Sequence, residues 1–596
     1  MRETQNEASE ELDWWHDFSW THGVGELLTA LERLSCLHPL AVVARKRLDI
    51  SFYPDIAHAV KLSLAATFFP GSAGEAAREE ASLDVSRTWL SSASILRSRG
   101  VEPRKQLHSC QTAAASSTAT PTDAGDNVAP FLSVRTAFDL YLKALALPRG
   151  SRIVCSALTI PDMVKIFLEH GLVPLPVDLD PNTLAPDPGA LESEVEKASG
   201  DRAEGSGTVR AVYVAHRIPL MSQVDMVPIA EAVARHGLLL WEDCAQVFTG
   251  LQGYLGHPAS DAVFFSFGVI KRATAFGGGV VRIGNKAILS AMQREEAQYP
   301  AQPAMTYLRR VFKCSMLLAC TSPLLFGILV HLLGLFGVDH DKVIMKLSHG
   351  FPKKGMLKAI RHRPCVPLLQ MLTWRIGRYT PDGVETRLRY CDRMLSLLDR
   401  ALPRQQLRRQ RDIVREQPLA VASNCRVQAG DVLPGIRAHR HTLWLFPVMV
   451  AGGSERADGV VEALLREGFD ATRAPTSLVP IDRCLAVDKP SSEGSCLPRC
   501  SVMMDSLVYL PLLNNIPDSE WDRLAMALAR VLSINTSTNS AEGGAIKLKE
   551  KRKLKRGRPT VSQRLAAFAL RLDTFVVSLL LLTVILPILV LVYLLV

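Results

Sequence analysis

Residues 152–180, RIVCSALTIPDMVKIFLEHGLVPLPVDLD, contain an apolar strand, a helix that ends at a glycine, and a second strand. Apolar residues have strand spacing at both ends of this stretch and helical spacing in its middle. The same alternation extends in both directions, with helices at 133–147 and 224–237 and strands at 209–216, 238–243 and 262–267. Strands that alternate with helices predict an α/β fold whose large domain has a mostly parallel sheet covered on both faces.

A second, smaller α/β unit follows in the C-terminal half, with strands at 441–450 and 506–512 and helices at 457–469 and 518–532. At 596 residues, with 48% hydrophobic and 21% charged residues, the chain is long enough for more than one core. We expect an N-terminal helical region (1–109), a flexible linker (110–130), a large cofactor-binding domain (131–300), an apolar and basic helical insertion (301–375), a small C-terminal domain (376–535), a basic linker (536–573) and a transmembrane helix (574–596).

Charge and cysteine content exclude several classes of function. The net charge is +10, but residues 547–558 (KLKEKRKLKRGR) carry +7 of it, so the remaining +3 does not predict nucleic-acid binding. The 12 cysteines are scattered and form no CxxC pair. Cys496 and Cys500 are the nearest approach to a zinc pattern, and they lack a second pair. We expect no metal site and free thiols in a reducing compartment.

The C-terminal stretch 574–596 has 23 residues without a charge, enough to cross about 30 Å of hydrocarbon. The basic segment before it places that side in the cytosol, so we expect a single-pass C-terminal anchor with the catalytic domain facing the cytosol. A buried core helix and a lipid-anchor signal are the alternatives. A second uncharged run, 314–338, predicts a helical hairpin in or against the bilayer surface, with a membrane crossing as its alternative.

Four polar residues are of the types that pyridoxal 5'-phosphate requires. That cofactor needs a lysine for its Schiff base, a carboxylate at its ring nitrogen and donors at a helix start for its phosphate. Lys271, Asp243, Ser266 and Thr136 lie at predicted strand ends, helix starts or adjoining loops. Taken singly, Lys271 also fits a solvated loop lysine, Asp243 a strand-end cap, and the two hydroxyls ordinary turn or helix-start residues.

The motifs EDCAQ (242–246), FFSFGVIK (264–271) and GGGVV (277–281) resemble the signature of the DegT-type sugar aminotransferases, which are pyridoxal-phosphate enzymes of the aspartate-aminotransferase fold. The resemblance is strong over roughly 128–300 and weak over 375–532. It implies that Lys271 bonds the cofactor and then moves the substrate proton, that Asp243 holds the ring nitrogen, that Gln246 approaches the ring hydroxyl, and that Ser266 and Thr136 bind the phosphate.

The chain departs from this family pattern at three places. Arg135 replaces a glycine before the phosphate-binding helix, where it either crowds the cofactor or contributes a charge. Ile160 stands where an aromatic residue commonly stacks on the cofactor ring. His216 is retained in HRIPLM, but the glycine that follows it in the family is not. Lys271 itself argues against the dehydratase branch of the family, which carries histidine at this position.

The resemblance implies a homodimeric aminotransferase that moves an amino group from glutamate or a similar donor to a keto-sugar or other membrane-proximal ketone. Acyl transfer to an amino acid is a variant that the motifs disfavour. The alternative from another class is a catalytically degenerate scaffold or binding protein at a membrane. Arg135 and Ile160 favour that alternative, whereas Lys271 and Asp243 oppose it.

Overall fold

The computed structural model describes residues 56–68, 74–97, 127–180, 183–200, 207–216, 222–320, 355–379, 384–402, 434, 440–441, 445–473, 478–482, 497–512 and 517–534. The predicted transmembrane helix, the basic linker and most of the run 314–338 lie outside these residues, as do residues 1–55. Among the helices that are described, none combines the length and apolarity needed to cross a membrane.

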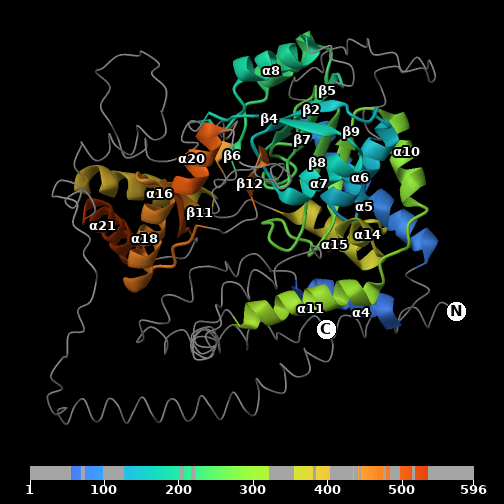
Figure 1. Cartoon of the computed structure of the whole chain (residues 1–596). Helices are drawn as coiled ribbons and strands as arrows, with labels where there is room; N and C mark the ends of the chain where they lie inside the picture. The colour runs from blue at the N-terminus through green and yellow to red at the C-terminus, as the bar shows by residue number, and fades with distance from the viewer. Residues whose placement is uncertain are drawn as a thin grey trace. The chain divides into compact units, whose positions relative to one another are not determined.

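A seven-stranded sheet forms the centre of the large domain (Figure 1). Its order is β1-β9-β8-β7-β5-β2-β4. The strands are β1 (Val128–Phe131), β2 (Arg152–Ser156), β4 (Val173–Val177), β5 (Val209–Ala215), β7 (Leu239–Asp243), β8 (Ala262–Ser266) and β9 (Gly279–Ile283). The five strands from β8 to β4 run parallel, and β9 and β1 are antiparallel to their neighbours. The predicted α/β fold with a mostly parallel sheet is confirmed.

Strand residues alternate between two cores, as the period of two requires. On one face Tyr213, Trp241 and Phe264 pack against α6 (Val134–Leu145) and α7 (Pro161–Glu169). On the other face Val212 and Leu240 pack against α8 (Pro188–Gly200) and α9 (Val227–Arg235). Helices thus cover both faces of the sheet, which leaves the strand ends as the place where polar side chains can meet a ligand.

The helices of the predicted insertion are part of the large domain. The helix α15 (Val366–Arg378) contributes Leu368, Leu369 and Leu372 to the core beside β8, and α11 (Ala304–Cys320) contributes Tyr307 and Val311. The helices α4 (Ile56–Phe68) and α5 (Glu75–Arg97) pack on α11 and α15, respectively. Two further helices of the large domain are α10 (Lys286–Glu296) and α14 (Met356–Ile360).

The small domain packs around Trp521, Phe446 and Leu528, in a core that also includes Leu158 and Leu179 of the large domain. Its elements are α16 (Val384–Ala401), β10 (Arg440–His441), β11 (Leu445–Met449), α18 (Gly453–Arg466), β12 (Val479–Pro480), α20 (Pro498–Ser506), β13 (Leu507–Pro511) and α21 (Asp518–Ile534). The strands β11 and β13 pair antiparallel. Two short pairings join this domain to the large one, β12 with β3 (Leu158–Thr159) and β10 with β6 (Ser222–Gln223).

The first strand begins at Val128, inside the segment 110–130 that the sequence predicts as a linker. Four residues with a proline give little strand signal, and the strand exists because it pairs along its whole length with β9. Proline is tolerated at an edge strand because its missing N–H group can lie on the unpaired side. The ordered domain therefore starts slightly earlier than composition predicts.

At Gly279, β9 packs closely against the start of α6. A Cβ atom at this position would lie 2.7 Å from the amide nitrogen of Val134 and 2.9 Å from the carbonyl carbon of Ser133, both of them backbone atoms. We expect Gly279→Ala to lower the midpoint of thermal unfolding, since overpacking of this kind costs about 1–3 kcal/mol. Gly459→Ala, where a Cβ meets nothing within 4 Å, is the matched control and should not destabilise the protein. Equal midpoints for the two variants would contradict this packing.

Candidate active site

The parallel strands bring the predicted site residues to one edge of the sheet. Asp243 is the last residue of β7, Ser266 is the last residue of β8, and the two strands are neighbours. Ser266 pairs with Gly279, the first residue of β9, so the loop 267–278 with Lys271 begins and ends at that edge. His216 follows β5 at the same edge. Carboxyl ends of parallel strands are where open α/β sheets bind their ligands.

The carboxylate of Asp243 is fully buried, and both of its oxygen atoms accept hydrogen bonds. The Tyr213 hydroxyl donates to Oδ2 at 2.7 Å, and the backbone N–H of Ala245 donates to Oδ1 at 3.0 Å. Burial of a carboxylate is costly unless donors or a cation compensate for the lost water. These two donors fix the orientation of the carboxylate at the strand end.

The loop that carries Lys271 is held in place by helices from outside the sheet. Three successive carbonyl groups accept hydrogen bonds from long side chains: Thr274 from Arg375 Nε (2.8 Å), Ala275 from the Tyr307 hydroxyl (2.9 Å) and Phe276 from Arg310 (3.2 Å). Burial raises the pKa of Tyr307 well above its ordinary value, so it remains a protonated donor. The half-buried Lys271 is itself in a turn, since its N–H donates to the carbonyl of Gly268 at 2.9 Å.

The start of α6 reaches the same edge. Ser133 caps the helix by accepting from the N–H of Thr136 at 3.1 Å. The Thr136 hydroxyl is buried and donates to the carbonyl of Ile360 at 2.8 Å, so the 2.9 Å contact between the two hydroxyls has Ser133 as its donor. The first-turn amides of a helix lack intrahelical acceptors and favour an anion. The structure thus gives Thr136 a partner in the protein, and the phosphate role predicted for it stays a prediction.

The two residues that depart from the family pattern lie beside this helix. Arg135 donates from Nε to Asp162, in the first turn of α7, at 2.9 Å. Ile160 is the N-cap residue of α7 and packs against the core shared by α6 and α7. Arg135 therefore has a structural partner, and Ile160 contributes apolar packing.

Two buried polar atoms near the strand ends have no hydrogen-bond partner among the described residues. One is Oε1 of Gln246, in the turn after β7, which the sequence predicts near the cofactor. The other is the hydroxyl of Thr159, at the end of β3 and directly before Ile160. An unpaired buried polar group is costly, and a bound ligand or an ordered water is what would satisfy it. The sequence analysis does not single out Thr159, although it directly precedes Ile160, one of the positions that depart from the family pattern.

A second polar network lies behind the site, on the opposite face of β7. Glu242 accepts from His216 Nε2 (2.7 Å), the Tyr254 hydroxyl (2.5 Å), the N–H of His257 (2.7 Å) and the Ser260 hydroxyl. His216 Nδ1 accepts from the N–H of Val224 at 3.1 Å, so its proton is on Nε2. Burial alone would raise the pKa of Glu242, but the hydrogen bonds that it accepts from His216, Ser260 and Tyr254 lower it to about 2.

His216, Glu242 and Cys244 are the one group of potential metal ligands found among the described residues. Their ligand atoms lie within 4.8 Å of one another, and all three residues are buried. However, Glu242 already accepts four hydrogen bonds, and burial raises the pKa of Cys244 well above its ordinary value. We interpret the group as a hydrogen-bonded support for the strand ends.

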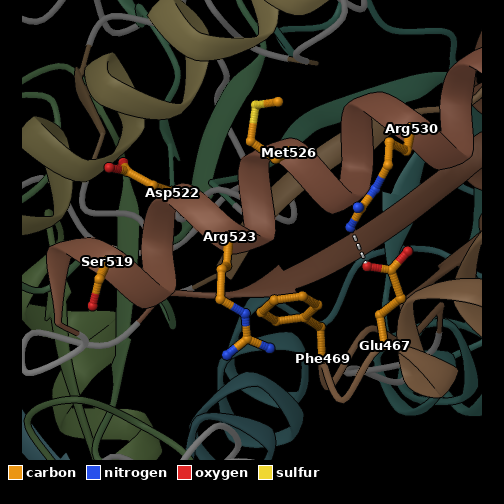
Figure 2. Close-up of a pocket in the computed structure, with 7 residues that line it drawn as sticks. All are labelled: Glu467, Phe469, Ser519, Asp522, Arg523, Met526 and Arg530. Atoms are coloured by element: carbon orange, nitrogen blue, oxygen red, sulfur yellow. Dashed lines mark hydrogen bonds and ion pairs between the residues drawn. The ribbon is translucent and has the colours of Figure 1, made fainter.

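A hollow on the small domain is separate from this edge (Figure 2). It is lined by residues near the end of α18 and along α21. Its charged groups are paired within the small domain, because Arg530 binds Glu467 at 2.6 Å and Arg523 binds Glu520 at 2.7 Å. The guanidinium of Arg523 also lies 5.2 Å from the ring centre of Phe469. We assign no chemistry to this hollow.

The depressed pKa of Glu242 predicts how stability depends on pH. Its ordinary pKa is 4.5 and its folded pKa is about 2, so the ionised group stabilises the fold fully above pH 4.5 and loses this effect as the pH falls towards 2. A shift of this size corresponds to about 3 kcal/mol. We expect Glu242→Gln to be less stable at neutral pH and to lose less stability over that interval, measured by denaturant unfolding. The exposed Glu462→Gln should follow the wild type, and a Glu242→Gln profile parallel to the wild type would refute the assignment.

Comparison with known proteins identifies the large domain. Residues 127–299 match the DegT/DnrJ/EryC1/StrS aminotransferase family. A putative L-glutamine:3-amino-2,3-dideoxy-scyllo-inosose aminotransferase of Micromonospora echinospora is 31% identical over 176 residues, which are 28% of this chain and 39% of that protein. The GDP-perosamine synthase of Caulobacter vibrioides is 28% identical over 160 residues, which are 26% of this chain and 40% of that protein. The matches thus span less than half the length of these relatives.

Solved structures of aminotransferases are also similar to the chain. A DegT DnrJ EryC1 StrS aminotransferase from Brucella abortus has a TM-score of 0.44 at 14% identity and covers 68% of this chain and 86% of its own. The aminotransferase TlmJ from Streptoalloteichus hindustanus has a TM-score of 0.43 at 15% identity. The match covers 69% of this chain and 87% of the TlmJ chain.

The family predicted from the sequence motifs is confirmed, and pyridoxal phosphate is the cofactor of that family. The chain carries an aminotransferase domain of the DegT/DnrJ/EryC1/StrS family over residues 127–299.

Proposed function

We propose that the protein is a pyridoxal-phosphate-dependent aminotransferase that converts a keto-sugar or related cyclic ketone into an amine, acting as a membrane-attached homodimer. The observation that carries this proposal is the shared edge of Asp243, Ser266, the Lys271 loop and the start of α6. The names of several relatives give L-glutamine as donor and an inosose, a cyclic ketone, as acceptor. We therefore propose glutamine or glutamate as the donor.

The residues at this edge fit the cofactor. The buried Oε1 of Gln246, unpaired among the described residues, suits a hydroxyl donor on the cofactor ring. Asp243 is a buried carboxylate held at the strand end, which suits a protonated ring nitrogen. The helix start at Ser133 suits a phosphate. The carboxyl edge of the sheet thus offers groups suited to a ring hydroxyl, to a protonated ring nitrogen and to a phosphate.

When bound, pyridoxal phosphate supplies an aldehyde that captures amines and an electron-poor ring that stabilises negative charge on the substrate carbon. The amine of Lys271 holds the cofactor and moves a proton at that carbon. Asp243 keeps a positive charge on the ring nitrogen. Ser266 and the first-turn amides of α6 bind the phosphate, because the Thr136 hydroxyl already donates to Ile360. Arg135 and Ile160 lie beside this helix, where Arg135 is paired with Asp162 and Ile160 packs against the core.

Lys271→Ala tests this proposal. We expect the wild type to be yellow when saturated with the cofactor, and borohydride reduction followed by peptide mass spectrometry to find the adduct on Lys271. The variant should carry no adduct, and its transfer of amino groups should fall by about 10²–10⁴-fold or more. Lys197→Ala, at an exposed lysine of α8, is the control and should behave as the wild type. A colourless wild type would instead support the scaffold alternative.

We further propose that residues 574–596 anchor the protein in a membrane with its catalytic domain in the cytosol. The proposal is supported by the absence of charge in that stretch and by the basic segment 547–558 before it. The full chain should stay in the membrane pellet after alkaline carbonate extraction, and a chain ending at residue 573 should be released. Release of the full chain would contradict the anchor.

A further inference from the structure

Tyr213 lies in the middle of β5, where the sequence shows only a residue of an apolar strand. Its side chain is completely buried, and its hydroxyl donates to Asp243 Oδ2 at 2.7 Å. In the register of β5 and β7, Tyr213 is opposite Trp241, and Ala215 is opposite Asp243. Tyr213 is thus the diagonal neighbour of Asp243 on the same face, and its phenol reaches from the core to the strand end.

The ring of Tyr213 is fixed by the helices that cover the sheet. It packs edge-on against Phe167 of α7, at a centroid distance of 5.5 Å and an interplanar angle of 88°, and lies 5.7 Å from Phe138 of α6. Close packing of aromatic rings leaves one orientation for the hydroxyl. The donor to Asp243 is therefore held by both helices as well as by its own strand.

The hydroxyl acts on the carboxylate from the core side. A carboxylate offers about four lone-pair sites. Tyr213 donates to Oδ2 and Ala245 donates to Oδ1, which orients the group and stabilises its negative charge. Supporting donors of this kind set how well a carboxylate binds a cationic ligand.

We propose that Tyr213 is a positioning residue for the cofactor: its hydroxyl holds Asp243 charged and oriented for the protonated ring nitrogen of pyridoxal phosphate. This inference rests on the proposed function and adds a residue to it. It predicts that Tyr213 affects only the interaction with the ring nitrogen, whereas a structural role would affect every ligand of the site.

The experiment compares two ligands on the full-length chain after removal of bound cofactor with hydroxylamine. One ligand is pyridoxal phosphate, and the other is its 1-deaza analogue, in which a carbon replaces the ring nitrogen. The variants are Tyr213→Phe, which keeps the ring and removes the hydroxyl, and Tyr141→Phe as the control. Tyr141 lies in the same core and packs on Trp241 and Phe264. Dissociation constants are measured by titration of protein fluorescence.

We expect Tyr213→Phe to bind pyridoxal phosphate about 10- to 100-fold more weakly than the wild type, the range for a lost hydrogen bond to a charged group. It should bind the deaza analogue as the wild type does, and Tyr141→Phe should bind both ligands normally. Equal weakening for both ligands, or no weakening for either, would overturn the role of Tyr213 and leave the proposed function standing. A wild type that binds neither ligand would overturn both.

Discussion

The site depends on one buried charge, the carboxylate of Asp243 at the end of β7. The parallel register of β5, β7 and β8 places it beside the end of β8, and Tyr213 and Ala245 supply the hydrogen bonds that its burial requires. A carboxylate in this position is costly unless hydrogen-bond donors or a cation compensate for the lost water. Three features hold this carboxylate: the sheet, the turn after β7, and the aromatic residues that pack against Tyr213.

Helices outside the family match complete the site. Residues 127–299 contain the sheet, yet the loop with Lys271 is fixed by Tyr307 and Arg310 of α11 and by Arg375 of α15. Ile360, at the end of α14, accepts the hydroxyl of Thr136 and so braces the start of α6. The segment 301–375, predicted as an apolar and basic insertion, therefore contributes directly to the geometry of the loop with Lys271 and of the start of α6.

The five parallel strands of the large sheet were predictable because hydrophobic periodicity sets the elements. The positions of Asp243 and Ser266 at strand ends followed from them, because parallel strands share one carboxyl edge. The hydrogen-bond partners of the polar residues were not predictable from the sequence. Thr136 bonds a carbonyl 224 residues away, and Tyr213 has the same apolar-strand signature as its neighbours. Such contacts arise from tertiary packing, which local patterns do not encode. The membrane anchor predicted from 574–596 lies outside the described residues and stays a prediction.

The most direct test of the account is a crystal structure of the full chain grown with pyridoxal phosphate. The account predicts continuous density from Lys271 Nζ to the aldehyde carbon of the cofactor, with a carboxylate oxygen of Asp243 at hydrogen-bond distance from the ring nitrogen. A cofactor bound elsewhere, or a ring whose nitrogen is too distant from Asp243 for a hydrogen bond, would contradict it.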